Sequence, residues 1–185
     1  TNQSKILINR NVIQRAKQVM PYLIYDENPY TVVTDDGKIM WVLDAYTVSS
    51  KYPYSQYTTI QHDGIKEKIN YIRNSVKVII DAYDGTMKFY ITDTTDPIAM
   101  AYRSVYPTLF EDINTQIPQD ISEHFVYPQY LYEVQAELLK IYHNVKSDVL
   151  YRTDDLWEFT KYNSTIISKS SGTILKPYYT MVKTE

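Results

Sequence analysis

The chain has 185 residues, no cysteine, a net charge of −3 and a pI near 5.6. Without cysteine it can form neither disulfides nor Cys-ligated metal sites, and its mild acidity argues against a nucleic-acid groove, which needs a dense basic face. No run of ~18 apolar residues occurs, so we do not expect this chain itself to cross a membrane. The length fits one domain with a substantial core.

The first predicted elements lie at the start of the chain. The string KILI, residues 5–8, indicates a short strand. A helix is predicted from there to about Met20, with Asn9 as its N-cap, because apolar residues recur at helical spacing on one side. Pro21 marks its end.

A hairpin is predicted next. Residues 31–34 and 38–47 both have strand character and are separated by Asp36-Gly37, a turn dipeptide. The return strand is apolar on both faces from Ile39 to Leu43, which is typical of a central strand.

The segment 49–68 is polar and interrupted by proline, so a long loop is predicted. Its Tyr52, Tyr54 and Tyr57 form a candidate binding surface, because tyrosine rings stack on a ligand while their hydroxyl groups form hydrogen bonds. Two alternatives stay open: the 20 tyrosines reflect genome composition, or Tyr52 and Tyr54 fold back over the sheet.

A second hairpin follows, with residues 75–83 and 87–92 alternating between apolar and polar side chains. Asp84-Gly85 between them predicts a type I′ turn, in which both central residues have positive φ. Both hairpins predict antiparallel pairing.

Helices are predicted in the second half of the chain. Asp96-Pro97 reads as N-cap and first helical residue of a helix that ends before Pro107, and Pro128 opens the longest helix, about 128–143. The remaining predictions are short helical pieces near 120–124 and 153–159 and an edge strand at 176–183. The predicted class is therefore α+β, an antiparallel sheet built from hairpins and packed with three or four helices.

Two similar strings, VLDAY and VIIDAY, each place an aspartate inside an apolar strand. These residues, Asp44 and Asp81, are candidate buried carboxylates, since a buried carboxylate needs donors or a charged partner. They either face each other as a pair or lie at strand ends and accept hydrogen bonds.

Motifs for other chemistry are missing from the sequence. It contains no glycine-rich phosphate loop, no nucleophile elbow and no regular calcium loop, and its three histidines lie far apart. We therefore predict no catalytic residues, no metal ligands and no cofactor.

Several strings, among them YPYSQ, INYIRNSVK, YPQYLYEVQAELLKIYH and PYYTMVK, resemble in order the uncharacterised protein family one-eighty-two of the UPF series. The resemblance implies a multi-pass bacterial or archaeal membrane protein with a large region outside the cytoplasm. This chain, 1–185, is then expected to be a single soluble extracytoplasmic domain excised from that protein. The resemblance brings no catalytic residues with it.

The leading functional hypothesis is a non-enzymatic extracytoplasmic interaction or structural domain of a protein of the cell membrane. Its expected partners are the rest of its own chain, envelope polymer or another protein, and not nucleic acid. The alternatives are a cell-envelope hydrolase that uses carboxylates and a glycan- or peptide-binding module. Converging carboxylates would favour the hydrolase, and exposed aromatic rings without them a binding module.

Overall fold

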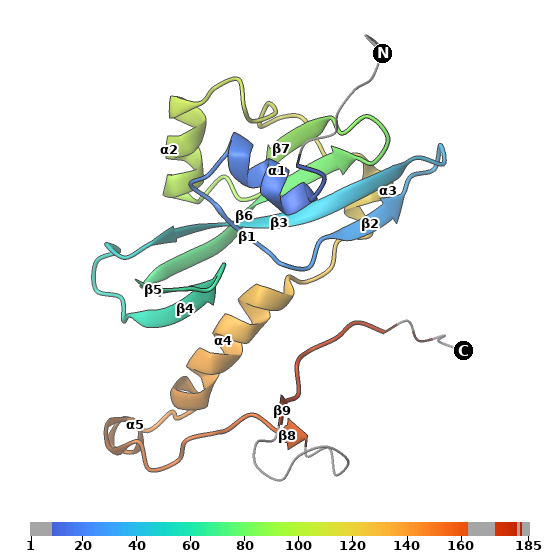
Figure 1. The fold of residues 1–185 in the computed structure, drawn as a ribbon. Helices are drawn as coiled ribbons and strands as arrows, with labels where there is room; N and C mark the ends of the chain where they lie inside the picture. Colours follow the sequence, from blue (N-terminus) through green and yellow to red (C-terminus); the bar gives the residue numbers. More distant parts are fainter. Residues whose placement is uncertain (1–8, 163–172, 181, 183–185) are drawn as a thin grey trace. The chain divides into compact units, whose positions relative to one another are not determined.

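The computed structural model describes residues 9–162, 173–180 and 182 (Figure 1). The chain divides into two compact units, Thr1–Pro128 and Gln129–Glu185, which are described separately. The strand predicted at 5–8 lies outside the described residues.

The first unit is built on a five-stranded sheet in which all strand pairs are antiparallel. Its strands are β1 (Ile24–Tyr25), β2 (Tyr30–Val33), β3 (Ile39–Ser49), β6 (Tyr71–Asp81) and β7 (Met87–Ile91). The order is β1-β3-β6-β7, and β2 pairs with β3 beside β1. Both predicted hairpins, β2–β3 and β6–β7, are confirmed, and β3 is the central strand that its two-sided apolar sequence predicted.

Helices cover both faces of this sheet. On one face α1 (Val12–Val19) and α2 (Pro97–Val105) lie over a core cluster from β3, β6 and β7, and this side is visible in Figure 1. On the other face the short α3 (Gln119–Ser122) places Ile121 against Val42 and Ile79. The α+β class is therefore confirmed.

The starts of α1 and α2 show how local sequence sets a helix boundary. Asn11 caps α1, its side chain accepting from the N–H groups of Ile13 and Gln14, so the predicted cap at Asn9 is wrong. Asn9 instead has a φ of 57°. Asp96 caps α2 and proline follows it, as predicted.

The turn at Asp84-Gly85 is not the predicted type I′ turn. Ile80 pairs with Met87, which leaves a longer connection between β6 and β7, and Gly85 has positive φ while Asp84 does not. The Asp81 carboxylate accepts from the N–H of Tyr83 at 2.7 Å, which favours a helical bend at this point.

The predicted loop over 49–68 is also wrong in its second part. Strands β4 (Thr58–His62) and β5 (Ile65–Ile69) pair antiparallel and are joined by Asp63-Gly64. Both residues have positive φ, 50° and 75°, so a two-residue primed turn occurs here and not at Asp84-Gly85. Lys17 of α1 holds this turn through Asp63, with its Nζ 2.5 Å from Oδ1.

The second unit contains the longest helix, α4 (Gln129–Tyr142), which begins after Pro128 as predicted. It continues with α5 (Ser147–Arg152) and a two-residue pairing of β8 (Lys161–Tyr162) with β9 (Thr173–Ile174). The helical piece predicted at 153–159 is wrong, because Thr153 adopts a left-handed φ of 54° that ends α5. The described part of the predicted edge strand, 176–180 and 182, pairs with no other strand.

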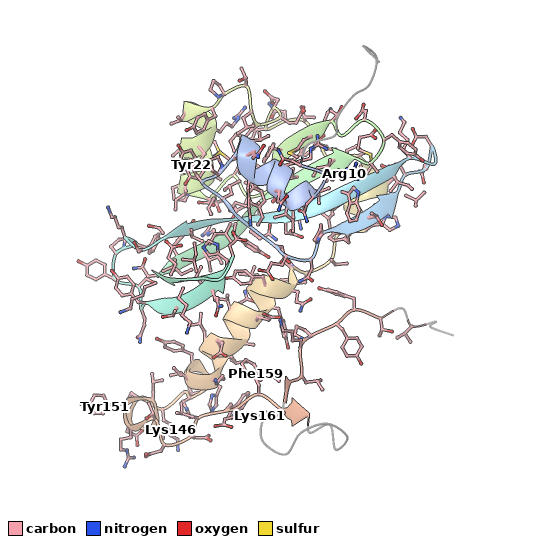
Figure 2. The ribbon with its side chains drawn as sticks, in the orientation of Figure 1. Arg10, Tyr22, Lys146, Tyr151, Phe159 and Lys161 are labelled. Carbon is pink, nitrogen blue, oxygen red and sulfur yellow. The ribbon has the colours of Figure 1, made fainter. Side chains whose placement is uncertain are left out.

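In this unit the Nζ of Lys140 lies 5.1 Å from the ring centroid of Phe159, which is labelled in Figure 2. The His143 ring stacks on Trp157 with 4.1 Å between centroids. None of the helices in the described ranges has both the length and the apolar character that crossing a bilayer demands.

Candidate functional site

The segment between β3 and β4, residues 50–57, is called here the tyrosine loop. It is held at its base by Asn70, whose side-chain NH2 donates to the carbonyl of Tyr52 at 2.7 Å and to that of Ser55 at 3.3 Å. The Oδ1 of Asn70 accepts from the N–H of Tyr52 at 3.0 Å. Ser55 Oγ donates back to the Asn70 carbonyl at 2.9 Å. One asparagine therefore fixes both sides of the loop.

The three candidate tyrosines of this loop are exposed, Tyr52 by 48%, Tyr57 by 50% and Tyr54 completely. The Tyr57 hydroxyl donates to the carbonyl of Ser50 at 3.0 Å, and Lys68 Nζ lies 5.3 Å from the Tyr57 ring centroid. Tyr54 has a φ of 57°, a conformation that few non-glycine residues adopt. The rings thus project from a backbone that hydrogen bonds hold in place.

Tyr52 is connected to the protein interior through Tyr71. The two rings stack with 5.0 Å between centroids and 25° between planes. The Tyr71 hydroxyl donates to Asp96 Oδ1 at 2.8 Å. The same carboxylate accepts from Thr47, from Ser75 Oγ at 2.5 Å and from the N–H of Ile98 at 2.9 Å.

Asp96 is completely buried, which opposes its ionisation. The hydrogen bonds from Ser75, Thr47, Tyr71 and the N–H of Ile98 outweigh that burial and hold the pKa of the Asp96 carboxyl below its ordinary value. Burial, and next the hydrogen bond to this carboxylate, raises the pKa of Tyr71 above its ordinary value. Asp96 is thus a carboxylate and Tyr71 a neutral donor near neutral pH.

An irregularity in β6 places Tyr71 on this side of the sheet. Ala45 pairs with Val76, but Thr47 pairs with Arg73, so three steps along β6 match two along β3. Side chains alternate between the two faces along a regular strand. Because of the extra residue, the side chains of β6 that precede Val76 lie on the faces opposite to those that simple alternation would give them. Tyr71, two residues from Arg73, consequently shares the face of Thr47 and reaches Asp96.

The structure does not bring Asp44 and Asp81 together. Asp44 pairs with Lys77 across the sheet and Asp81 with Met40, four residues away along β3. Asp44 is buried and accepts from Lys77 Nζ and from Asn74 Nδ2, the latter at 2.6 Å. Asp81 lies half-buried at the end of β6 and accepts from the N–H groups that follow it. Each is held by its own donors.

No group of three or more His, Asp or Glu side chains is placed to hold a metal ion in the part of the chain that the structure describes. His62 lies 3.4 Å from Glu67 and 3.6 Å from Asp63. His143 belongs to the second unit, where it lies 3.6 Å from Asp155.

Sequence reasoning missed the residues behind the tyrosine loop: Thr47, Asn70, Tyr71 and Ser75. It singled out Asp96 only as a helix cap. A weak signal was present, since Asn70 is a polar residue just before β6 and Ser75 is a polar residue just before the apolar alternation begins. That Thr47, Tyr71 and Ser75 all donate to Asp96 became visible only when β3, β6 and α2 were placed together.

The fold and this surface define an α+β domain that presents an anchored aromatic loop. The chain belongs to the Uncharacterised protein family (UPF0182), whose model matches residues 1–185. It is 49% identical over 98% of its length to the UPF0182 protein of Caldicellulosiruptor saccharolyticus and 46% identical over 98% to that of Clostridium acetobutylicum, covering 19% of each relative. The UPF0182 protein of Trichodesmium erythraeum is 38% identical over 99% of the chain, which covers 21% of that relative.

The chain therefore spans about a fifth of the length of the curated relatives it matches. No solved structure matches it.

Proposed function

We propose that this chain is a non-enzymatic interaction domain in the extracytoplasmic part of a multi-pass membrane protein, and that the tyrosine loop is its contact surface. The observation that carries the proposal is the set of exposed rings of Tyr52, Tyr54 and Tyr57 on a backbone anchored by Asn70. Tyrosines held in this way lose little conformational entropy on binding, and they offer both stacking and hydrogen bonds.

The charge around the loop favours a polar or anionic partner. Three lysines lie nearby: Lys51 on the loop, and Lys66 and Lys68 on β5. Lys68 faces the Tyr57 ring, and no carboxylate among the described residues contacts any of the three. A polymer of the cell envelope, with sugar rings to stack on tyrosine and acidic groups to meet lysine, fits this combination.

The buried carboxylates support a binding role over hydrolysis. A carboxylate that acts as acid or nucleophile must reach a substrate in a cleft. Asp96 and Asp44 instead use hydrogen bonds and an ion pair to join strands and helices. Asp26, also buried, accepts from the Tyr46 hydroxyl at 2.6 Å.

The membrane context of the proposal rests on the family. The relatives are about five times longer than the region matched here, so they have ample length for membrane spans elsewhere. We propose the rest of the parent chain as a second partner of the loop.

Retention on immobilised peptidoglycan tests the contact surface. The double variant Tyr52→Ala, Tyr54→Ala should lose most of the retention that the unsubstituted chain shows. The matched control is Tyr151→Ala, Tyr178→Ala, which removes two exposed tyrosines from the second unit and should be retained normally. Circular dichroism verifies that both variants fold. Equal retention of the two double variants would refute the role of the loop.

Labelling in intact cells tests the location. The chain has no cysteine, so Tyr54→Cys in a cysteine-free parent protein creates one exposed thiol. A membrane-impermeant maleimide should label it in whole cells as completely as after lysis. Labelling only after lysis would place the loop inside the cytoplasm and overturn the proposal.

A further inference from the structure

A hollow of about 500 Å³ opens on the first unit, between the start of α1 and the β6–β7 turn. Its walls come from Arg10 and Arg15 on one side and from Asp81 to Gly85 on the other, with Trp41 and Ile80 of the sheet beneath. The volume falls within the range of about 300–1,000 Å³ usual for small-molecule sites. None of the three loop tyrosines lines it.

The basic side of the hollow has one engaged and one unengaged guanidinium group. Arg15 Nη2 donates to the Gly85 carbonyl at 2.6 Å, and a Cβ added to Gly85 would lie 2.4 Å from Arg15 Nη1. Glycine at this position thus leaves the space that Arg15 occupies. Arg10, labelled in Figure 2, is exposed, and no acceptor in the described residues contacts its guanidinium group.

On the acidic side of the hollow, the carboxylate of Asp81 is also only partly hydrogen-bonded. Asp81 Oδ1 accepts from the N–H groups of Tyr83 and Asp84, at 2.7 and 3.3 Å. Its second oxygen, Oδ2, receives no donor from the described residues. Counting partners among the described residues only, an unpaired cation, Arg10, and a carboxylate with one unbonded oxygen, Asp81, thus border the same hollow.

The floor between these charges is apolar. Trp41 is half-buried and packs against the core cluster on the α1 side of the sheet, next to Ile80. An indole ring at the base of a pocket offers a flat apolar surface to a ligand.

We infer that this hollow binds a small zwitterion with an apolar body, namely a free amino acid or a dipeptide. Its carboxylate pairs with Arg10, its ammonium group pairs with Asp81, and its side chain packs on Trp41. An anion alone would meet Asp81 and Asp84, and a cation alone would meet Arg10 and Arg15, so opposite charges on one ligand fit the walls best. The inference does not depend on the tyrosine loop.

Trp41 supplies the measurement, because the chain has only one other tryptophan, Trp157. In a Trp157→Phe background, L-leucine should change the Trp41 fluorescence saturably. Leucinamide, which lacks the carboxylate, and 4-methylpentanoate, which lacks the ammonium group, should each bind about tenfold more weakly or worse, the size expected for one charge-assisted hydrogen bond. Calorimetry on the unsubstituted chain gives a second reading.

Variants test the walls. Arg10→Gln should weaken leucine binding about tenfold while leaving leucinamide unaffected, and Asp81→Asn should weaken leucine while leaving 4-methylpentanoate unaffected. Arg152→Gln, an exposed arginine of the second unit, is the matched control and should bind normally. The inference is overturned if leucine gives no saturable signal up to about 10 mM by either method, the weak end of specific binding. It is equally overturned if the three ligands bind alike, or if Arg10→Gln binds like the control.

Discussion

Asp44 and Asp96 are both buried in the first unit, with 4% and 0% of their surface exposed, but the protein compensates their charges differently. Asp44 is paired with a buried cation, Lys77, and accepts one further bond from Asn74. Asp96 contacts no cation among the residues that the structure describes, and it accepts from three hydroxyl groups and one backbone N–H.

The difference shows two structural uses of a carboxylate. The Asp44–Lys77 pair joins two adjacent strands that the backbone ladder already joins, so it mainly neutralises charge. The donors to Asp96 come from β3, β6 and α2, so this one group fixes the relative positions of three elements. It also supports the tyrosine loop through Tyr71.

The largest expected effect is that of Lys77→Met. Removing the cation leaves the Asp44 charge buried and unpaired, and the free energy of unfolding should fall by about 3–5 kcal/mol. Urea unfolding followed by circular dichroism measures it. Lys88→Met is the control, because Lys88 is exposed and lies 3.7 Å from Glu111, and it should change stability by less than about 1 kcal/mol. Similar losses for the two variants would show that Asp44 does not depend on Lys77.

Asp96→Asn should cost less, about 2–3 kcal/mol. Asparagine keeps the helix cap, but it loses the charge-assisted bonds, and its NH2 group then faces hydroxyl donors. The tyrosine loop should also loosen, seen as faster amide exchange at Tyr52. Asp112→Asn, at an exposed pair 3.7 Å from Arg103, serves as the control. Unchanged exchange at Tyr52 would disconnect the loop from Asp96.

Tyr71→Phe isolates one of the four bonds. The ring and its stacking on Tyr52 remain, while Asp96 loses one donor, so the expected loss in unfolding free energy is about 1–2 kcal/mol. Retention on peptidoglycan should persist, because the aromatic surface is intact. A loss as large as that of Asp96→Asn would mean that the other donors to Asp96 contribute little.

The pH dependence of Asp96 gives the smallest expected effect. Its pKa is lowered in the folded protein despite burial, because the hydrogen bonds outweigh burial. Its contribution is therefore complete above the unfolded pKa, about 3.9, and is lost as pH falls through the folded pKa. The difference in stability between the unsubstituted chain and Asp96→Asn should shrink below about pH 4. A constant difference down to pH 2 would contradict the lowered pKa.

Alternation and turn dipeptides were sufficient to predict the two large hairpins and the central position of β3, and proline was sufficient to predict the starts of α2 and α4. The Asp-Gly dipeptide did not predict the type of turn, since Asp63-Gly64 forms a primed turn and Asp84-Gly85 does not. At Asp84-Gly85 the side chain of Asp81 competes for the backbone N–H groups and alters the bend. That competition is not visible in a dipeptide.

The candidate site was predictable only in its exposed part. Tyr52, Tyr54 and Tyr57 stand out because three tyrosines fall within one polar segment next to proline. Asn70 and Tyr71 lie in a later part of the chain than the loop, and Thr47 and Asp96 are 49 residues apart. Only tertiary packing brings these residues together. Sequence periodicity carries no information on such contacts.

The extra residue in β6 makes the length of this strand as important as its composition. Inserting one residue between Tyr71 and Ile72 would keep every existing residue and both hairpins, yet it would move Tyr71 one position past Ser49 and turn its side chain to the opposite side of the sheet. Asp96 would then lose Tyr71, and Tyr52 would lose the ring on which it stacks. A substitution at these positions weakens single bonds, whereas a change of one residue in length would separate the loop from its support in a single step.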